Sequence, residues 1–367
     1  MCIIKTLTYN SYIDTLLQMP TFEAFINRIH FTIIDLFSIM DKRKVTKIGV
    51  LTSGGDSPGM NAAIRAVVRT GNYYGLSVFG IMRGYQGMVE DDIMHMTNRS
   101  VANIIQRGGT ILKTARCKEF MEPAGREKAY NNLLKHGIDG LVVIGGDGSF
   151  RGAQKFSSEY DIPCIGLPGT IDKDIAGSDV TIGFDTAVNT AVEAIDKIRD
   201  TMDAHDRLFL VEVMGRDAGY IALHSGIATG AENILIPETE TDIEELINSL
   251  NEKEKRKKLV NLVVVAEGDK FGGAEEIAKI IKKRIPMADT RVCVLGHIQR
   301  GGSPTCSDRL IASHMGYYAV ESLMMGRSNV MVGVINNKIH YTPLDKAVKE
   351  KQKIGQEWMK IVKILAS

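Results

Sequence analysis

The sequence contains no long hydrophobic run and no excess of charge of either sign. None of its apolar stretches reaches the roughly 18 residues that a membrane span requires. The 45 Lys and Arg residues against 44 Asp and Glu residues leave a formal net charge of +1. Because nucleic acids and anionic membranes are bound by broad positive surfaces, both partners are excluded. Any positive field must then come from a few clustered arginines.

Patterns that form disulfides or zinc sites are also absent. The five cysteines include no CxxC pair, and Cys164 and Cys293 lie within apolar, strand-like runs. The eight histidines show neither HxxxH nor HExxH spacing. The sequence therefore predicts reduced structural thiols in a cytosolic protein and no zinc site built by the protein.

The amino-terminal segment lacks the features of a signal peptide. Residues 1–39 have no charged start and no small-residue cleavage site, and Asn10 and Asp14 interrupt the apolar residues. The pattern of a globular protein begins at Met40, since the short charged segment after it leads directly into the first predicted strand. We therefore expect residues 1–44 to be an extension of doubtful status and Met40 to be the true start. A regulatory extension is the alternative, and sequencing of the native amino terminus would distinguish them.

Short apolar runs of strand length alternate with segments of helical periodicity. The predicted strands are Ile48–Thr52, Leu141–Ile144, Cys164–Leu167, Leu208–Val213, Leu262–Ala266 and Arg291–Leu295. The predicted helices are Met60–Thr70, Arg126–His136, Thr186–Met202, Ile243–Leu250, Ala274–Arg284 and Asp308–Met325. Uniformly apolar strands between helices indicate parallel sheets covered on both faces, with ligands at the carboxyl ends of the strands. A length of 367 residues predicts two lobes. The charged stretch Asn251–Lys258 is either a solvated helix end or an anion site.

Two glycine-rich loops follow predicted strands. In Thr52–Asn61, adjacent glycines allow close backbone approach, and Ser57 followed by Pro58 predicts a helix cap whose exposed amides suit phosphate. In Gly145–Ser149, three glycines surround Asp147, which suits a carboxylate that reaches Mg²⁺ beside cradled phosphates.

A third loop, Pro168–Asp174, carries two carboxylates. Asp172 and Asp174 point to the same side of an extended segment, where they repel unless a cation or a proton-transfer role holds them. One can deprotonate a hydroxyl while the other helps to hold metal.

Two further loops combine glycine with arginine. These are Val213–Arg216, preceded by Arg207, and Gly296–Pro304, preceded by Arg291. The planar guanidinium suits a phosphorylated substrate. The sequence has no Walker A motif and no HRD or DFG motif, and its first loop lacks the GxGxxG pattern of nicotinamide-dependent dehydrogenases.

Taken together, these loops resemble those of the bacterial ATP-dependent 6-phosphofructokinases in order and spacing, from about Lys47 to the carboxyl end. The resemblance implies an α/β fold of two similar three-layer lobes with largely parallel sheets and an active site in the cleft between them. It implies an ATP-binding lobe of residues 45–182 with 298–348 and a fructose 6-phosphate lobe of residues 183–297 with 349–367. It also implies Mg²⁺ as cofactor and a cytoplasmic homotetramer with shared active sites.

The resemblance implies a role for each matching residue. Asp172 matches the general base, Asp147 the magnesium ligand, and Thr170 and Arg116 the groups that steady charge on the moving phosphoryl. Arg216 is a further residue that matches the catalytic set. The positions that match the ATP site are Gly55, Arg116, Cys117, Gly146, Asp147, Gly148 and Ser149. The positions that match the fructose 6-phosphate site are Thr170, Ile171, Asp172, Met214, Gly215, Arg216, Glu267, His297, Ile298, Gln299 and Arg300, with Arg207 and Arg291 from a neighbouring subunit. The positions that match an effector site for ADP or phosphoenolpyruvate are Arg65, Arg69, Arg199, Gly230, Ala231, Glu232, Arg256 and Lys258.

Some positions bear on the phosphoryl donor or depart from the family pattern. Pyrophosphate-dependent relatives carry larger residues where this chain has Gly148 and Gly169, so we expect ATP. Lys173 replaces the usual asparagine, and its ammonium either lowers the pKa of Asp172 or points into solvent. In the effector site, Lys257 replaces an expected glycine and Asn98 an expected arginine, so the ligand and the sign of regulation stay open.

Two alternatives to this function remain at this stage. One is a pyrophosphate-dependent phosphofructokinase, which a comparison of donors would identify. The other is a non-catalytic, sugar-phosphate-sensing subunit, although such a subunit has no need of intact Asp147, Asp172 and Arg216.

Overall fold

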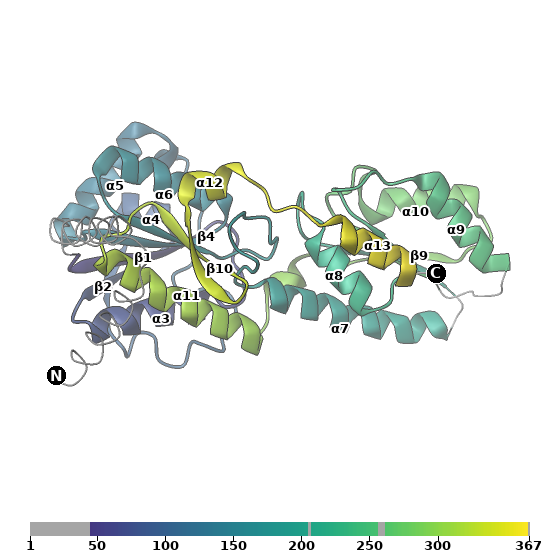
Figure 1. The fold of residues 1–367 in the computed structure, drawn as a ribbon, viewed down its shortest axis with the longest axis horizontal. Coiled ribbons are helices and arrows are strands. Elements are labelled where there is room, and N and C mark those ends of the chain that lie inside the picture. The colour runs from purple at the N-terminus through teal and green to yellow at the C-terminus, as the bar shows by residue number, and fades with distance from the viewer. Residues whose placement is uncertain (1–44, 205–206, 256–260, 366–367) are drawn as a thin grey trace, which may run out of the picture. The chain divides into compact units, whose positions relative to one another are not determined.

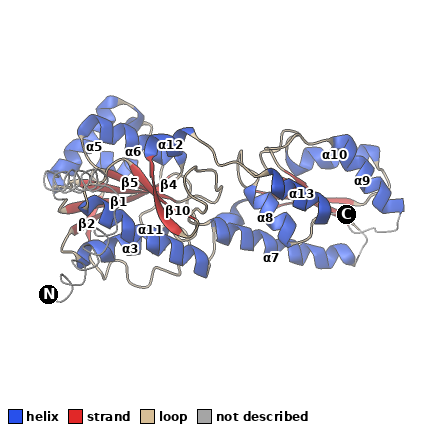
Figure 2. Ribbon diagram, viewed as in Figure 1, coloured by secondary structure: helices blue, strands red, loops and turns tan. Residues whose placement is uncertain are grey.

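The computed structural model describes residues 45–204, 207–255 and 261–365, and its strands form two sheets (Figures 1 and 2). The hypotheses about residues 1–44, Arg256, Lys257 and Lys258 lie outside the described residues. Within the described residues, no helix is both long and apolar enough to cross a membrane.

The first sheet has seven strands and is mainly parallel. Only its two outer pairs, β2–β3 and β10–β11, are antiparallel. In sheet order the strands are β11 (Lys338–Pro343), β10 (Val330–Ile335), β5 (Cys164–Pro168), β4 (Gly140–Gly145), β1 (Lys47–Ser53), β2 (Ser77–Ile81) and β3 (Ile93–Met96).

Side chains of the central strands alternate between two apolar cores. Ile48 and Val50 of β1 enter one core, while Leu51 enters the other, as the pleat of a strand requires. The first core lies under α3 (Met60–Tyr73) and α11 (Cys306–Met324). The second lies under α4 (Tyr85–Glu90), η1 (Glu119–Met121), α5 (Pro123–His136), α6 (Asp147–Tyr160) and α12 (Leu344–Lys349).

The second sheet has four strands, all parallel, and is also covered on both faces. In sheet order the strands are β7 (Asn233–Leu235), β8 (Asn261–Ala266), β6 (Leu208–Val213) and β9 (Thr290–Val294). One face packs against α7 (Phe184–Asp203), α8 (Tyr220–Ala228) and α13 (Gln356–Leu365). The other packs against α9 (Ile243–Lys255) and α10 (Gly273–Arg284). The expected α/β fold with two three-layer arrangements is therefore confirmed.

All six predicted strands and all six predicted helices are present, with ends shifted by a few residues. The part of the predicted helix end that the structure describes is helical, since α9 runs as far as Lys255.

The predicted helix cap at Ser57 is wrong. Helix α3 begins at Met60 and its cap residue is Gly59, whose φ of 104° is left-handed and suits glycine. The Ser57 hydroxyl is buried without a hydrogen-bond partner among the described residues. Its Cβ packs against the backbone of Gly183, where an added Cβ would lie only 2.5 Å away. Close packing between two loops therefore replaces the cap.

Candidate active site

A cavity of about 650 Å³ opens where the glycine-rich loops meet. Its walls come from the carboxyl ends of β1, β4, β5 and β6 and from η2 (Gly296–Arg300). The predicted residues that line it are Gly55, Arg116, Cys117, Gly146, Asp147, Gly148, Ser149, Thr170, Asp172, Asp174, Arg216 and Arg300. Four of the five loops singled out in the sequence thus meet with η2 of the fifth in one place. The loops after β1, β4 and β5 meet because parallel strands deliver their carboxyl ends to the same edge of the first sheet, and the loop after β6 and η2 bring their residues from the second sheet.

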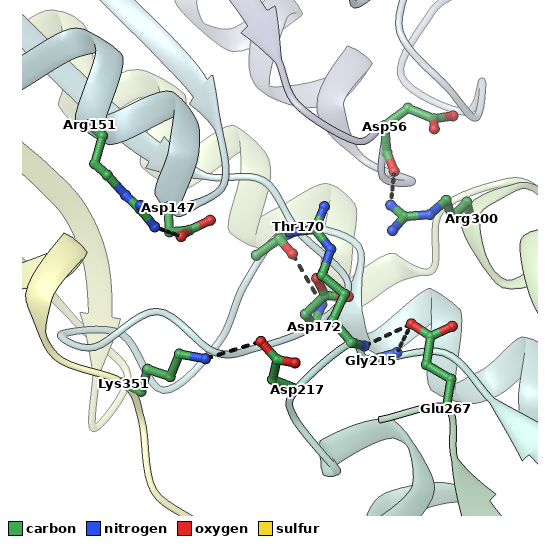
Figure 3. A network of polar contacts seen from close by, with 11 residues as sticks. Asp56, Asp147, Arg151, Thr170, Asp172, Gly215, Asp217, Glu267, Arg300 and Lys351 are labelled. Carbon is green, nitrogen blue, oxygen red and sulfur yellow. Dashed lines mark hydrogen bonds and ion pairs between the residues drawn. The ribbon is translucent and has the colours of Figure 1, made fainter. Parts of the chain in front are cut away.

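Asp172 lies at the centre of this group (Figure 3). It is only 3% exposed, and its backbone N–H donates to the Thr170 hydroxyl at 3.1 Å. Its Oδ2 lies 3.6 Å from Nε of Arg216, whereas Oδ1 is buried without a hydrogen-bond partner among the described residues. Burial and the neighbouring Asp174 carboxylate raise the pKa of Asp172 to about 6, against the opposing effect of Arg216. Such a group is an effective proton acceptor near neutral pH.

The segment that holds this carboxylate is bent. Lys173 has a left-handed φ of 54°, yet Asp172 and Asp174 both face the cavity, so the predicted shared side is confirmed although the predicted extended backbone is wrong. The Lys173 ammonium points away from Asp172, as one of the two hypotheses expected, but it lies over the rings of Phe184 and Tyr220 instead of in open solvent. The charges that act on the pKa of Asp172 are those of Asp174, Arg216, Arg300 and Glu267.

Asp147 and Asp174 supply further carboxylates to the cavity. Asp147 is the first residue of α6, and its carboxylate contacts the guanidinium of Arg151 one turn later. Burial and the charge of Asp147 raise the pKa of Asp174. A carboxylate such as Asp174, whose charge is disfavoured by a neighbouring carboxylate, suits a site that also holds a divalent cation.

This set of donors fits Mg²⁺ bound together with its substrate. The described residues hold no cluster of three or more His, Cys, Asp or Glu side chains placed to form a complete metal cage. Mg²⁺ is usually bound by one or two carboxylates, water and substrate phosphates, so a complete cage is not required.

The glycines of the cavity differ in how much room they leave for a side chain. A Cβ added at Gly148 would meet no atom within 4 Å, so a side chain there would extend freely at the cavity wall. A Cβ at Gly169 would lie 3.0 Å from Ile144 and 3.1 Å from Met60. The first atoms that a side chain at Gly169 would meet are therefore core side chains, although Gly169 itself lines the cavity. The steric argument about the phosphoryl donor is clearest at Gly148.

The other end of the cavity is apolar and includes residues that sequence reasoning missed. Tyr85 and Phe120 stack with ring centroids 4.2 Å apart, and Met121 lies beside them. Arg126 is buried there and pairs with Glu159, with its Nε 2.5 Å from Oε2 of the carboxylate. These residues lie in η1 and α5 and in α4, away from the glycine-rich loops, so no local pattern indicated them. Arg151 could have been identified from the sequence as a residue of the cavity wall, since it lies four residues after Asp147 and therefore on the same helix face.

The loops after β6 and β8 hold Arg216 toward Asp172. Glu267 accepts hydrogen bonds from the backbone N–H groups of Gly215 at 3.3 Å and Arg216 at 2.8 Å (Figure 3). Met214 is buried in the adjoining core. Three of the predicted sugar-site residues thus form one structural unit whose arginine faces the cavity.

Other predicted sugar-site residues are placed differently. Arg300 donates to the carbonyl oxygen of Asp56 at 3.2 Å, while His297 and Ile298 are exposed. The Gln299 side chain is fully buried and binds the Met214 N–H, and the Ile171 side chain is in the core. The side chains of Gln299 and Ile171 therefore support the loops instead of reaching a ligand.

Arg207 and Arg291 lie away from this cavity. Arg207 precedes β6 and Arg291 lies near the start of β9, whereas the cavity is at the carboxyl ends of the strands. Both arginines pair with Asp289, Arg207 at 2.8 Å and Arg291 at 3.0 Å. They do not line the cavity of their own chain.

The residues proposed for an effector site fall into two groups. Arg65 and Arg69 share a face of α3, and burial together with Arg69 lowers the pKa of Arg65. Arg199 of α7 donates to the carbonyl oxygens of Thr229 at 2.5 Å and Gly230 at 3.1 Å, and Ala231 is buried beside them. Glu232 instead accepts from the Leu262 N–H at 2.7 Å.

Strand-end loops that bring carboxylates, exposed backbone and arginines into one cavity define a class of α/β enzyme that acts on metal-bound phosphate groups. The chain belongs to the phosphofructokinase family, whose profile matches residues 47–323.

Individual relatives agree with this assignment. The chain is 55% identical to a protein of a Thermoanaerobacter species and 53% identical to one of Cytophaga hutchinsonii, both named ATP-dependent 6-phosphofructokinase. Each match covers 87% of this chain, and 99% and 97% of the relatives respectively. The solved phosphofructokinase of Saccharomyces cerevisiae superposes with a TM-score of 0.79 at 38% identity, over 83% of this chain and 45% of that chain.

Proposed function

We propose that this chain is an ATP-dependent 6-phosphofructokinase. It transfers the γ-phosphoryl group of Mg-bound ATP to the 1-hydroxyl of fructose 6-phosphate, giving ADP and fructose 1,6-bisphosphate, the committed step of glycolysis. The observation that carries this proposal is the state of Asp172. It is a buried carboxylate in the cavity wall with a pKa of about 6, and one of its oxygens accepts no hydrogen bond from the described residues.

In this proposal Asp172 takes the proton of the sugar hydroxyl through Oδ1, so that the oxygen can attack phosphorus. Arg216 and Arg116 stabilise negative charge on the moving phosphoryl, and Thr170 holds the base by its contact with the Asp172 N–H. Ser149 and the backbone around Gly55 and Gly146 cradle phosphates.

The nucleoside occupies the apolar end beside Tyr85, Phe120 and Cys117. The sugar phosphate binds near Glu267, Arg216, His297 and Arg300.

Asp147, with Asp174 nearby, would hold Mg²⁺ together with ATP. The ion would neutralise phosphate oxygens and relieve the repulsion between the two carboxylates. The open space at Gly148 supports ATP as the donor in preference to pyrophosphate, and the names of the 53–55% identical relatives agree.

Further proposals concern the whole assembly. The active enzyme is a cytoplasmic homotetramer in which Arg207 and Arg291 serve a neighbouring subunit. The lobes are residues 45–182 with 298–348 and residues 183–297 with 349–367, a division supported by the strands that each sheet uses. Arg65, Arg69, Arg199 and the backbone near Gly230 bind an anionic effector such as ADP or phosphoenolpyruvate, which regulates the enzyme.

A coupled assay of ADP formation tests the central proposal. Wild type turns over fructose 6-phosphate with Mg-ATP, and Asp172→Ser lowers kcat by at least roughly a thousandfold with little change in KM. Pyrophosphate in place of ATP serves as the donor control. Absence of turnover by wild type with either donor would refute the proposed function, and near-normal turnover by Asp172→Ser would refute the assigned base.

A further inference from the structure

The side chain of Lys173 faces away from the two carboxylates that flank it. Asp172 and Asp174 face the cavity. The Lys173 ammonium lies 4.9 Å from the ring centroid of Phe184 and 5.3 Å from that of Tyr220. Both distances are within the range of a cation–π interaction.

The two rings belong to different helices. Phe184 is the first residue of α7 and Tyr220 the first of α8, and both rings are nearly buried, with 7% and 6% of their surface exposed. We call these two side chains the aromatic bracket. Because it is built from the ends of two packed helices, its position is fixed by the core of the second sheet.

More aromatic groups surround the bracket. The ring of His224 stands edge-on to Phe184 at 5.1 Å and lies 5.7 Å from the ring of Trp358 in α13. Burial, and then the charge of Lys173, lower the pKa of His224 to about 4, so this imidazole is neutral at physiological pH. Lys173 is therefore the cation of this cluster.

The backbone of Lys173 does not itself favour lysine. Its φ of 54° is left-handed, a conformation that costs energy for a residue with a Cβ and that glycine or asparagine adopts more easily. Such a conformation persists only where the surroundings impose it. The contacts of the Lys173 side chain act on this turn together with the hydrogen bond that the Gln352 N–H donates to the Asp174 carbonyl oxygen at 3.4 Å.

We propose that Lys173 is a positioning residue, whose cation–π contacts with the aromatic bracket hold the turn that aims Asp172 and Asp174 into the cavity. This inference rests on the proposed function, since it assigns a role in the same reaction. It predicts that loss of the cation lowers the rate of the chemical step while substrate binding is maintained, because even a small displacement of a catalytic group slows the reaction.

The test compares Lys173→Met with Lys173→Arg in the assay of ADP formation. Methionine keeps the length and apolar character of the side chain but removes the charge, and we expect kcat to fall by about tenfold to a hundredfold, with both KM values within about twofold. Arginine keeps a cation that stacks on aromatic rings, and we expect it to retain most of the activity. Lys197→Met on α7 is the matched control, because the Lys197 side chain is 72% exposed and pairs with Glu193 one turn earlier.

Variants of the bracket provide an independent test. We expect Phe184→Leu and Tyr220→Leu each to lower kcat in the same direction, and Lys173→Met combined with Phe184→Leu to lower it no further than the more severe single variant. Circular dichroism of each variant establishes that the chain is folded.

The possible outcomes separate this inference from the proposed function. If wild type is inactive with both donors, the proposed function fails. If wild type is active and Lys173→Met keeps its kcat, or raises only KM, the positioning role fails alone. If Lys173→Arg loses as much as Lys173→Met, the cation–π contact is refuted. Additive effects of Lys173→Met and Phe184→Leu would refute the bracket.

Discussion

At the scale of single residues, the site depends on how burial changes ordinary side chains. Asp172 would be a weak base in water, but its position at 3% exposure beside Asp174 raises its pKa to about 6. Arg216 and Arg300 act in the opposite direction and keep the carboxylate from a larger shift. The result is a carboxylate that is ionised at neutral pH and still binds a proton readily.

This environment predicts the acid limb of the pH profile. The base must be deprotonated to act, so kcat/KM for fructose 6-phosphate should fall as pH decreases through about 6. Initial rates measured between about pH 5 and pH 8 span this pKa and show the pH at which activity falls.

The substrate phosphate also titrates near this pH, so a variant is needed as a control. Asp174→Asn removes the charge that raises the pKa of Asp172, and it should move the acid limb to lower pH while the titration of the substrate stays the same. An acid limb at the same pH in Asp174→Asn and wild type would show that the limb does not report Asp172.

Gly148 makes a second prediction at this scale. Because a Cβ added there meets no atom of the described residues within 4 Å, Gly148→Asp should fold normally but place a carboxylate against the phosphates of ATP. We expect KM for ATP to rise by at least about tenfold, a loss equivalent to one charge repulsion of about 1.4 kcal/mol or more, with KM for fructose 6-phosphate little changed. Gly148→Ala is the control and should have a small effect. Equal KM values for ATP in wild type and Gly148→Asp would contradict the assigned position of the triphosphate.

At the scale of elements, one buried side chain joins helices that pack in different cores. Asp308 of α11 is fully buried and accepts hydrogen bonds from the N–H groups of Gly183 and Thr186, both at 2.8 Å, and from the Thr186 hydroxyl at 2.5 Å. It thereby caps the amino terminus of α7, a position where a negative charge is favourable. This contact links the loop after β5 to the helices on both sheets.

Asp308→Ala should therefore destabilise the protein strongly. It leaves two backbone donors and a hydroxyl buried without partners, and we expect the free energy of unfolding to fall by about 2–4 kcal/mol. Thr305→Ala removes a cap at the more accessible start of α11 and should cost about 1 kcal/mol. Chemical denaturation measures both, and similar stabilities of Asp308→Ala and wild type would mean that the buried cap contributes little.

At the scale of the whole molecule, the distribution of arginines argues for assembly. Arg207 and Arg291 lie at the ends of β6 and β9 that are opposite to their own cavity, where each pairs with Asp289. A role in phosphate binding therefore requires a second copy of the chain.

Subunit complementation tests that role. Asp172→Ser lacks the base but keeps both arginines, while Arg207→Ser with Arg291→Ser keeps the base. After the two variants are mixed, dissociated and reassembled, sites that combine the intact base with intact arginines should restore activity above that of either parent. If the arginines acted within their own chain, every hybrid site would lack one component and no activity would return.

Local patterns in the sequence were sufficient for the elements that carry the loops. The runs of β1, β4, β5, β6 and β8 are apolar because both faces of each sheet are covered, and this also made them recognisable. The outer strand β9 was recognised from its apolar run although most of its residues are exposed or partly buried. Strands β2, β3, β7, β10 and β11 were not predicted. Strand β7 has only three residues, and the outer strand β11 alternates exposed and partly buried residues, so their signals are weak.

Sequence alone determined that the glycines and carboxylates after β1, β4 and β5 would gather, since the carboxyl ends of parallel strands meet at one edge of a sheet. Only the tertiary structure brought Arg216, which follows a strand of the other sheet, to the same place. Tertiary structure alone decided what each of them does there. It withdrew Gln299 and Ile171 into the interior, placed Tyr85 and Phe120 in the cavity wall, and turned Lys173 onto the aromatic bracket. The physical reason is that burial, pKa and side-chain direction depend on neighbours that are distant along the chain, and no local pattern records them.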